Sequence, residues 1–513
     1  MTFQRSQYHS DRIGIRARES TKIIGPIFQV MFRNLARCGL LLLLLGSLAL
    51  AKTFTAEEFF ADGAVVACIG DSITHGGRWH RYVAEYCATR FPDRSIRFLN
   101  GGISGDSAGG VLTRLDQDIL SQRPNAAVVM LGMNDVQGWL YKKGAESDPQ
   151  LAQKRQRAHA DYVKNMGQIL DRLQREGQGL HRILLMTPSP YDQTAQIARE
   201  AAIGQNEALG TFAQSVRELA AERGLPVVDN HATMTAMNLA HQKADPTSTI
   251  INEDRVHPGP PGSLVMAWLF LKACQSPALV SHVALDVPTR SVVAHEGAEI
   301  EHLAWEGTAT SFTLTERSLP WPIAPEARPA LDWAPILDDL NRQTLAVTGL
   351  PSGTHTLYID DVLVGTWSDK ELATGVNLAG LPMSPQLEQA RRVQLLCEER
   401  RRIQEELRSI PFVELMWIKA GTVDLGDFTA VTAAMDMHVE KHGGPGGYFG
   451  GIAKTYRTVK PQVASFTKRV DELSDEIRAA AHPVPHRYRL NPILPAQPAQ
   501  PPGEAVNPTI PRG

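Results

Sequence analysis

The chain has 513 residues, with 52 lysines and arginines against 55 aspartates and glutamates. This length exceeds what one ordinary hydrophobic core holds, so two or three domains are expected. The balanced charge lacks the basic face that nucleic-acid-binding proteins usually carry, so nucleic acid is excluded as an expected partner.

The N-terminal region has the pattern of an export signal. An apolar run at residues 40–50 follows Arg33 and Arg37 and ends in a small-x-small tripeptide. This order predicts a cleaved signal peptide over residues 1–51 and a periplasmic or extracellular protein. The run is shorter than the roughly twenty residues that span a bilayer, so no permanent membrane span is expected after cleavage. Met31 would begin a signal of ordinary length and is the expected true start.

The first predicted strand, at residues 64–70, leads directly into the motif Gly70-Asp71-Ser72. Short apolar runs rich in Val and Ile are typical of strands buried on both faces of a parallel sheet. Ligands bind at the carboxyl ends of strands in such sheets. Ser72 is therefore expected at the crevice, near the positive end of the helix that follows.

Two further strand ends carry candidate proton donors. The predicted strand at 96–100 leads to Gly105, which would allow a backbone N–H to face the crevice without a side chain in the way. The strand at 126–132 leads to Asn134, an amide on the same rim. Gly-Asp-Ser recurs at Gly105 to Ser107, but Ser107 opens a helix, where serine commonly caps the N-terminus.

Strands and helices alternate through this half of the chain. Two more apolar runs, at 182–188 and 225–230, are separated by stretches at 154–176 and 199–223 that have helical spacing of apolar residues. This alternation predicts an α/β fold with a doubly wound parallel sheet of about five strands.

Asp254 and His257 supply the remaining parts of an acyl-transfer site. A serine hydroxyl is a weak nucleophile until an imidazole takes its proton, and the imidazole needs a carboxylate to hold its tautomer. We expect His257 to be the base for Ser72, and Asp254 to orient it. The N–H groups of Ser72 and Gly105 and the Asn134 amide would stabilise the oxyanion.

Four ordered blocks resemble the SGNH, or GDSL-type, hydrolase family: Gly70-Asp71-Ser72, the glycine block ending at Gly105, Gly132-x-Asn134-Asp135 and Asp254-x-x-His257. The resemblance covers residues 62–275 and implies a flavodoxin-like α/β/α sandwich without metal or cofactor. It implies Ser72, Asp254 and His257 as the catalytic triad and Ser72, Gly105 and Asn134 as oxyanion donors. Family members often have asparagine after His-Pro. Here Gly259 follows instead, which affects the loop but removes no catalytic group.

Four side chains near the predicted crevice are candidates for contact with a substrate. His75 could tune substrate access or only pack and hydrogen-bond locally. Trp79, Trp139 and Tyr141 could line an acceptor site, since aromatic faces hold sugar rings, or could be ordinary packing material. The sequence leaves both readings open.

The remaining chain divides by composition into three parts beyond a hydrolase domain at 52–280. Alternating apolar and polar residues predict a small β-rich accessory unit at 285–380. Residues 381–481 read as a helical segment, in which arginines interleaved with glutamates predict a solvated, salt-bridged face. The Pro-rich residues 482–513 are expected to be disordered.

The sequence thus predicts an exported serine ester hydrolase that acts through an acyl-enzyme on a small-molecule or polysaccharide ester. A carbohydrate O-acetylesterase is favoured. A lipid esterase or lysophospholipase of the same family is the alternative, and a non-catalytic glycan-binding or structural protein is the alternative of another class. The acyl and alcohol parts, the role of residues 285–481, the oligomeric state and a disulfide among Cys68, Cys87, Cys274 and Cys397 stay open.

Overall fold

The computed structural model describes residues 53–145, 148–307, 309–418 and 421–493. The predicted signal peptide and the expected start at Met31 lie outside these residues. In the part of the chain that is described, no helix is both long enough and apolar enough to cross a bilayer. The four cysteines of this part are buried free thiols.

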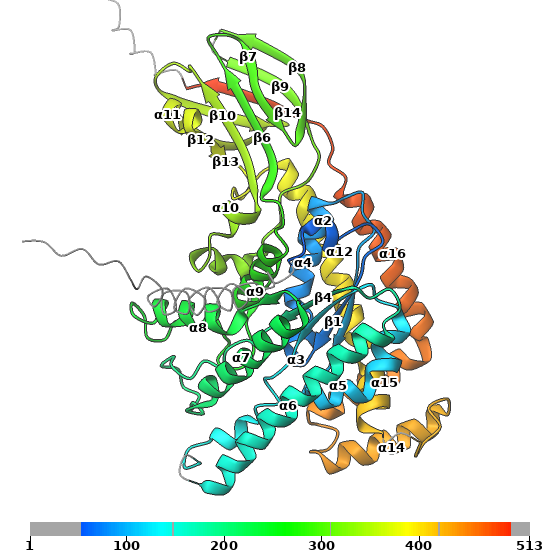
Figure 1. Cartoon of the computed structure of the whole chain (residues 1–513). Helices are drawn as coiled ribbons and strands as arrows, with labels where there is room; N and C mark the ends of the chain where they lie inside the picture. Colours follow the sequence, from blue (N-terminus) through cyan, green and yellow to red (C-terminus); the bar gives the residue numbers. More distant parts are fainter. Residues whose placement is uncertain (1–52, 146–147, 308, 419–420, 494–513) are drawn as a thin grey trace, which may run out of the picture. The chain divides into compact units, whose positions relative to one another are not determined.

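A five-stranded parallel sheet forms the centre of the first domain (Figure 1). Its strands are β1 (Val65–Gly70), β2 (Arg97–Gly102), β3 (Ala126–Met130), β4 (Arg182–Met186) and β5 (Val227–Val228). They are arranged in the order β2-β1-β3-β4-β5, and each pair is parallel. Every residue of β3 and β4 is buried, as the continuous apolar runs predict. The predicted α/β fold class is confirmed.

Helices cover this sheet in two groups. They are α2 (Ala56–Phe59), α3 (Ser72–His75), α4 (Arg78–Arg90), α5 (Ala108–Arg114), α6 (Pro149–Glu176), α7 (Gln205–Arg223), α8 (Asn230–His241) and α9 (Pro260–Ala273), with the short η1 (Leu115–Ile119), η2 (Leu120–Gln122) and η3 (Gly138–Tyr141). Helix α4 packs against α9, whereas α5 packs on α6 and α6 on α7. The strand order reverses beside β1, so its carboxyl end opens at the switch point.

The second domain consists of two β-sheets around their own core. The strands are β6 (Leu279–Asp286), β7 (Ser291–Glu296), β8 (Ala298–Glu306), β9 (Ala309–Glu316), β10 (Arg342–Thr348), β11 (Thr354–Ile359), β12 (Val362–Ser368), β13 (Val376–Asn377) and β14 (His486–Pro492), with the short helices η4 (Pro325–Asp332), α10 (Ile336–Leu340) and α11 (Asp369–Thr374). One sheet has the order β13-β10-β6-β7 and the other β12-β11-β14-β9-β8. A core of apolar side chains from both sheets, including Phe312 and Leu357, lies between them.

Strand β14 corrects the prediction of a disordered tail over 482–513. Residues 486–492 pair with β11 on one side and β9 on the other, and the Tyr488 ring stacks on Phe312 with 5.0 Å between centroids. His486, Tyr488 and Leu490 are buried in alternation with more exposed neighbours. Residues 494–513 lie outside the described part of the chain.

The boundary of the β-rich unit also differs from the prediction. Strand β6 begins at Leu279, within the predicted hydrolase domain. The segment that connects β9 to β10 returns to the first domain, where Trp321 is fully buried and its indole N–H donates to the Tyr82 carbonyl at 3.1 Å. The two domains therefore share a packed connection.

A helical segment leaves the β-domain after β13 and returns to it at β14. It contains α12 (Pro385–Leu407), α13 (Ser409–Pro411), η5 (Phe412–Trp417), α14 (Phe428–Lys441), α15 (Tyr448–Val459), η6 (Lys460–Gln462) and α16 (Val463–Ala481). Ser384 caps α12 by accepting from the Leu387 N–H, and Pro385 takes the first helical position. Helix α12 packs against both α16 and α4.

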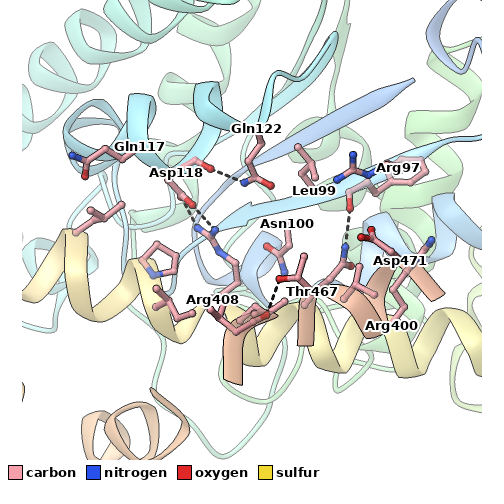
Figure 2. A pocket seen from close by; sticks show the side chains of 18 of the residues that line it. Arg97, Leu99, Asn100, Gln117, Asp118, Gln122, Arg400, Arg408, Thr467 and Asp471 are labelled. Atoms are coloured by element: carbon pink, nitrogen blue, oxygen red, sulfur yellow. Dashed lines mark hydrogen bonds and ion pairs between the residues drawn. The ribbon is translucent and has the colours of Figure 1, made fainter. Parts of the chain in front are cut away.

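Helix α12 covers the edge of the parallel sheet that β2 forms. The Gln404 amide donates to the Phe98 carbonyl of β2 at 3.0 Å, and the Arg408 guanidinium donates to the Gly102 carbonyl at 3.0 Å. Figure 2 shows Arg408 paired with Asp118 beside a cavity of about 480 Å³ between β2, α12 and α16. Arg400 is buried, so the predicted solvated face is wrong for this position, and Arg408 is buried as well.

Candidate active site

Ser72 begins α3, directly after β1, at the carboxyl edge of the sheet. The Asp71 carboxylate caps this helix by accepting from the Ile73 N–H at 3.0 Å. Gly70 admits this turn because a β-carbon there would lie 2.3 Å from the Thr74 hydroxyl oxygen. Burial, with repulsion from Asp135 and Asp106, raises the pKa of Asp71 to about 7. The structure thus places Asp71 in a structural role and leaves Ser72 facing outward.

Ser72, His257 and Asp254 form one hydrogen-bonded chain. The Ser72 Oγ lies 2.8 Å from Nε2 of His257, and Nδ1 of His257 lies 2.7 Å from Oδ2 of Asp254. Ser72 at the start of α3 and His257 in the later loop lie 185 positions apart in the chain. A carboxylate that binds Nδ1 holds Nε2 in the tautomer able to accept the serine proton.

The Asp254 carboxylate is held in its ionised form by the loop itself. Its Oδ1 accepts from the backbone N–H groups of Val256 and His257, each at 2.9 Å. Partial burial acts to raise the pKa of Asp254, but these hydrogen bonds and the imidazole outweigh it and hold the pKa below its usual value. The carboxylate can therefore orient His257 without competing for its proton.

Arg255 fixes this loop, a role that the sequence analysis missed. Its backbone has a positive φ of 66°. Its buried guanidinium donates to the carbonyls of Asp192, Ala195 and Arg199, the first two at 2.8 and 3.0 Å. The only signal in the sequence was the charged residue between Asp254 and His257, because the carbonyl groups that Arg255 bonds lie more than fifty residues away in the chain.

Gly105 and Asn134 lie on the rim beside Ser72. Gly105 has a φ of 81°, a left-handed conformation that favours glycine, although a β-carbon there would meet nothing within 4 Å. The Asn134 amide donates to the Asp106 carbonyl at 2.8 Å, which ties the end of β3 to the residue after Gly105. The two predicted oxyanion donors therefore belong to one connected rim.

A buried network of two arginines and two aspartates is bonded to this rim. Arg114 bonds Asp106 at 2.8 Å, donates to the Gly101 carbonyl at 2.9 Å, and also pairs with Asp118. Arg408 of α12 closes the network with a bidentate contact to Asp118, both distances being 2.6 Å. Burial opposes ionisation of Asp118, but the two arginines hold its pKa below the usual value. The helical segment is thus connected to the loop that carries Gly105 through three successive ion pairs, Arg408 with Asp118, Asp118 with Arg114 and Arg114 with Asp106.

The structure places the candidates for substrate contact in different surroundings. His75 lines a cavity with Ser72 and accepts from the Ser104 N–H at 3.1 Å. Burial and the nearby Arg408 charge lower the pKa of His75 to about 4, so it is neutral at physiological pH. Of the two readings left open for Trp79, the structure shows packing: it is 2% exposed and packs edge-on against Phe270 in the core.

Trp139 and Tyr141 also differ in their surroundings. Trp139 is 50% exposed and lines a second cavity of about 600 Å³ together with Asn134 and Val256. Tyr141 is half-buried, with the Arg155 guanidinium 4.8 Å from its ring centre. Tyr141 lines neither the cavity of Ser72 nor that of Asn134.

The cavity that contains Ser72 and His257 has a volume of about 460 Å³ and two walls. The α/β wall consists of Ser72, His75, Gly76, Ser104 and His257. The helical wall consists of Arg402, Glu405, Glu406, Ser409, Tyr448, Ile452 and Thr455. Six of these seven side chains carry a polar or charged group, and Ile452 is the apolar one.

Comparison with known proteins agrees with this geometry. Residues 68–264 match the model of the GDSL-like lipase/acylhydrolase family. An acetylxylan esterase of Geobacillus stearothermophilus is 28% identical over 228 residues, which are 41% of this chain and 94% of that protein. The solved structure of a gut microbial diltiazem-metabolizing enzyme is similar with a TM-score of 0.77 and 30% identity, over 86% of this chain and all of the other.

The family match contains the hydrogen-bonded pair of Ser72 and His257, and the structural likeness extends into the β-domain and the helical segment, since it covers 86% of the chain. The chain belongs to the GDSL, or SGNH, hydrolase family and is a carboxylic ester hydrolase.

Proposed function

We propose that this chain is an exported serine esterase that removes acetyl groups from a carbohydrate through an acyl-enzyme. The observation that carries the proposal is the hydrogen-bonded chain of Ser72, His257 and Asp254, with links of 2.8 and 2.7 Å, at the edge of a cavity whose second wall carries charged side chains. Serine, imidazole and carboxylate in this order are the parts that acyl transfer needs.

The mechanism follows from these positions. Ser72 Oγ attacks the acetyl carbon as its proton passes to Nε2 of His257, and the Asp254 carboxylate stabilises the imidazolium. The oxyanion accepts hydrogen bonds from the N–H groups of Ser72 and Gly105 and from the Asn134 amide. The bond between the acetyl carbon and the sugar oxygen then breaks, and the imidazolium proton goes to the departing alkoxide.

The second half of the reaction regenerates the enzyme. A water molecule gives a proton to His257 and attacks the acetyl group on Ser72. The bond from carbon to Ser72 Oγ breaks, the proton returns to that oxygen, and acetate leaves. The same donors bind the oxyanion in both halves.

A carbohydrate substrate is favoured by the cavity and by the relative that acts on acetylxylan. The helical wall places Arg402, Glu405 and Glu406 opposite Ser72. Such a wall suits hydroxyl groups, and burying the chain of a fatty acyl group against charged side chains is costly. The 28% identity to an acetylxylan esterase spans the hydrolase domain.

The test compares acyl chains and alcohols. We expect the protein to hydrolyse p-nitrophenyl acetate much faster than p-nitrophenyl octanoate and to release acetate from acetylated xylan. Faster hydrolysis of the octanoate would identify a lipid esterase instead. Equal turnover by the wild type and Ser72→Ala would leave only a non-catalytic glycan-binding or structural role.

Export is tested separately, because the signal peptide lies outside the described residues. N-terminal sequencing of the mature protein from an expressing culture should give a start near Lys52. Recovery of the chain with residues 1–51 intact would contradict export.

A further inference from the structure

The cavity that contains Ser72 is completed by the helical segment, which lies outside the residues that match the family model. Of its two walls, the α/β wall carries the groups that react. The helical wall carries Glu405 and Glu406 of α12 and Tyr448 of α15, none of which has a part in the chemistry of acyl transfer. These side chains lie where the part of the substrate beyond the reacting bond must lie.

Helix α12 is fixed against the loop that follows Ser72. The Arg401 guanidinium donates to the Gly76 carbonyl at 2.9 Å and to the Glu405 carboxylate at 2.6 Å. Gly77 allows this approach, because a β-carbon there would lie 2.9 Å from Cγ of Arg401. These contacts therefore fix the position of the helical wall relative to Ser72.

Glu406 and Tyr448 have the exposure that ligand contact requires. Glu406 is exposed on α12, and its backbone carbonyl accepts from the Ser409 hydroxyl at 2.7 Å, which fixes the turn that carries it. Tyr448 is 58% exposed at the first position of α15, while its neighbour Phe449 packs on Trp417. One side chain offers a carboxylate to hydroxyl groups and the other an aromatic face.

We propose, on the basis of the function proposed above, that the helical wall is the binding site for the alcohol half of the ester and that Glu406 and Tyr448 select a neutral sugar. Glu406 accepts hydrogen bonds from sugar hydroxyls, which are charge-assisted and stronger than neutral ones. Tyr448 covers an apolar face of the sugar ring. A uronic acid is disfavoured because its carboxylate would lie beside that of Glu406, whereas Glu405 is paired with Arg401.

The experiment compares a sugar ester with a phenyl ester in the same variants. The variants are Glu406→Gln and Tyr448→Ala, and the matched controls are Glu440→Gln and Met437→Ala, two exposed positions of α14 outside this cavity. The substrates are an acetylated xylooligosaccharide and p-nitrophenyl acetate. Melting temperatures show that each variant is folded.

We expect kcat/KM for the xylooligosaccharide to fall about tenfold in each wall variant, mainly through KM, and to fall much less for p-nitrophenyl acetate. Both control variants should match the wild type on both substrates. Equal falls on both substrates, or no fall on either, would overturn the role of the helical wall while leaving the esterase intact.

A different result bears on the proposed function itself. Wild-type protein that hydrolyses p-nitrophenyl acetate but releases no acetate from any sugar ester would overturn the carbohydrate assignment and this inference together. An unchanged ratio of activity on an acetylated uronic acid to that on the neutral oligosaccharide in Glu406→Gln would show that Glu406 does not select against charge, and would overturn that part of the proposal.

Discussion

The side chains proposed to react in the Ser72 cavity are hydrogen-bonded to one another, whereas Tyr448, which is proposed to select the substrate, is largely exposed. In the α/β wall, His75 is 6% exposed and bonded to Ser104, and Ser72 is bonded to His257 at 2.8 Å. In the helical wall, Tyr448 is 58% exposed. Groups that take part in bond making need a preorganised geometry, whereas groups that select a substrate can adapt. The difference indicates that the chemistry and the choice of alcohol can be altered separately.

The largest expected effect is on the α/β wall itself. Ser72→Ala removes the nucleophile, and turnover of p-nitrophenyl acetate should fall by about 10⁴-fold or more. Ser107→Ala is the matched control, since it alters the second Gly-Asp-Ser copy, where Ser107 caps α5 through a 3.3 Å bond to the Gly110 N–H. This control should keep its turnover and lose about 1 kcal/mol of stability. Comparable turnover losses in both variants would contradict the assignment of Ser72.

Asn134→Ala should lower kcat by about a hundredfold, because one oxyanion donor is lost. Its amide also bonds the Asp106 carbonyl, so the melting temperature must be measured beside the kinetics. A decrease in kcat below threefold would remove Asn134 from the oxyanion site.

Arg408→Gln tests the link between the two walls. The substitution leaves Asp118 buried with only Arg114 as its cation, and loss of one partner of a buried pair costs about 3–5 kcal/mol. Urea unfolding should show this loss. Arg402→Gln, whose side chain is 70% exposed where it pairs with Glu398, should lose less than about 1 kcal/mol. Similar losses in the two variants would mean that the buried network contributes little.

The pKa of His80 tests the packing of α12 against α4. Burial first, and then the charges of Arg401 and Arg400 on α12, lower the pKa of His80 from 6.5 to about 4. Between these pH values the unfolded chain binds a proton that the folded chain does not, so stability is lost as pH falls from 6.5 to 4. This difference amounts to about 3 kcal/mol.

His80→Gln removes that proton while keeping a donor for the Thr74 carbonyl. We therefore expect the difference in the free energy of unfolding, wild type minus variant, to fall by about 3 kcal/mol as the pH is lowered from 7 to 4. A difference that is constant with pH would contradict the neutral, buried state of His80.

The α/β domain was predictable because its signals are local. Each of the five apolar runs formed a strand, and the residues at their ends could be placed on one rim by the rule that parallel strands share an edge. Ser72 and His257 were brought together this way although 185 positions separate them. The sequence analysis also found the acid beside His257, because three residues fit within one loop.

Other features depended on contacts that no local pattern encodes. The partner of Arg408, Asp118, lies 290 positions away in the chain, so nothing in the sequence indicated this ion pair. The sequence left the role of Trp79 open, and only the packing of α4 shows that its aromatic residues Trp79, Tyr82 and Tyr86 are all buried. The alternation in residues 486–490 was present in the sequence, but the prolines around it hid a strand.

The position of β14 has a consequence for how the protein is made. In the sheet order β12-β11-β14-β9-β8, the strand of this sheet that is synthesised last among the described residues is the central one. Until residue 492 has been synthesised, β11 and β9 each present an open edge to other nascent chains, because the strand that joins them does not yet exist. A chain that ends before residue 486 would leave this sheet as two separate hairpins, even with every residue of the parallel-sheet domain in place.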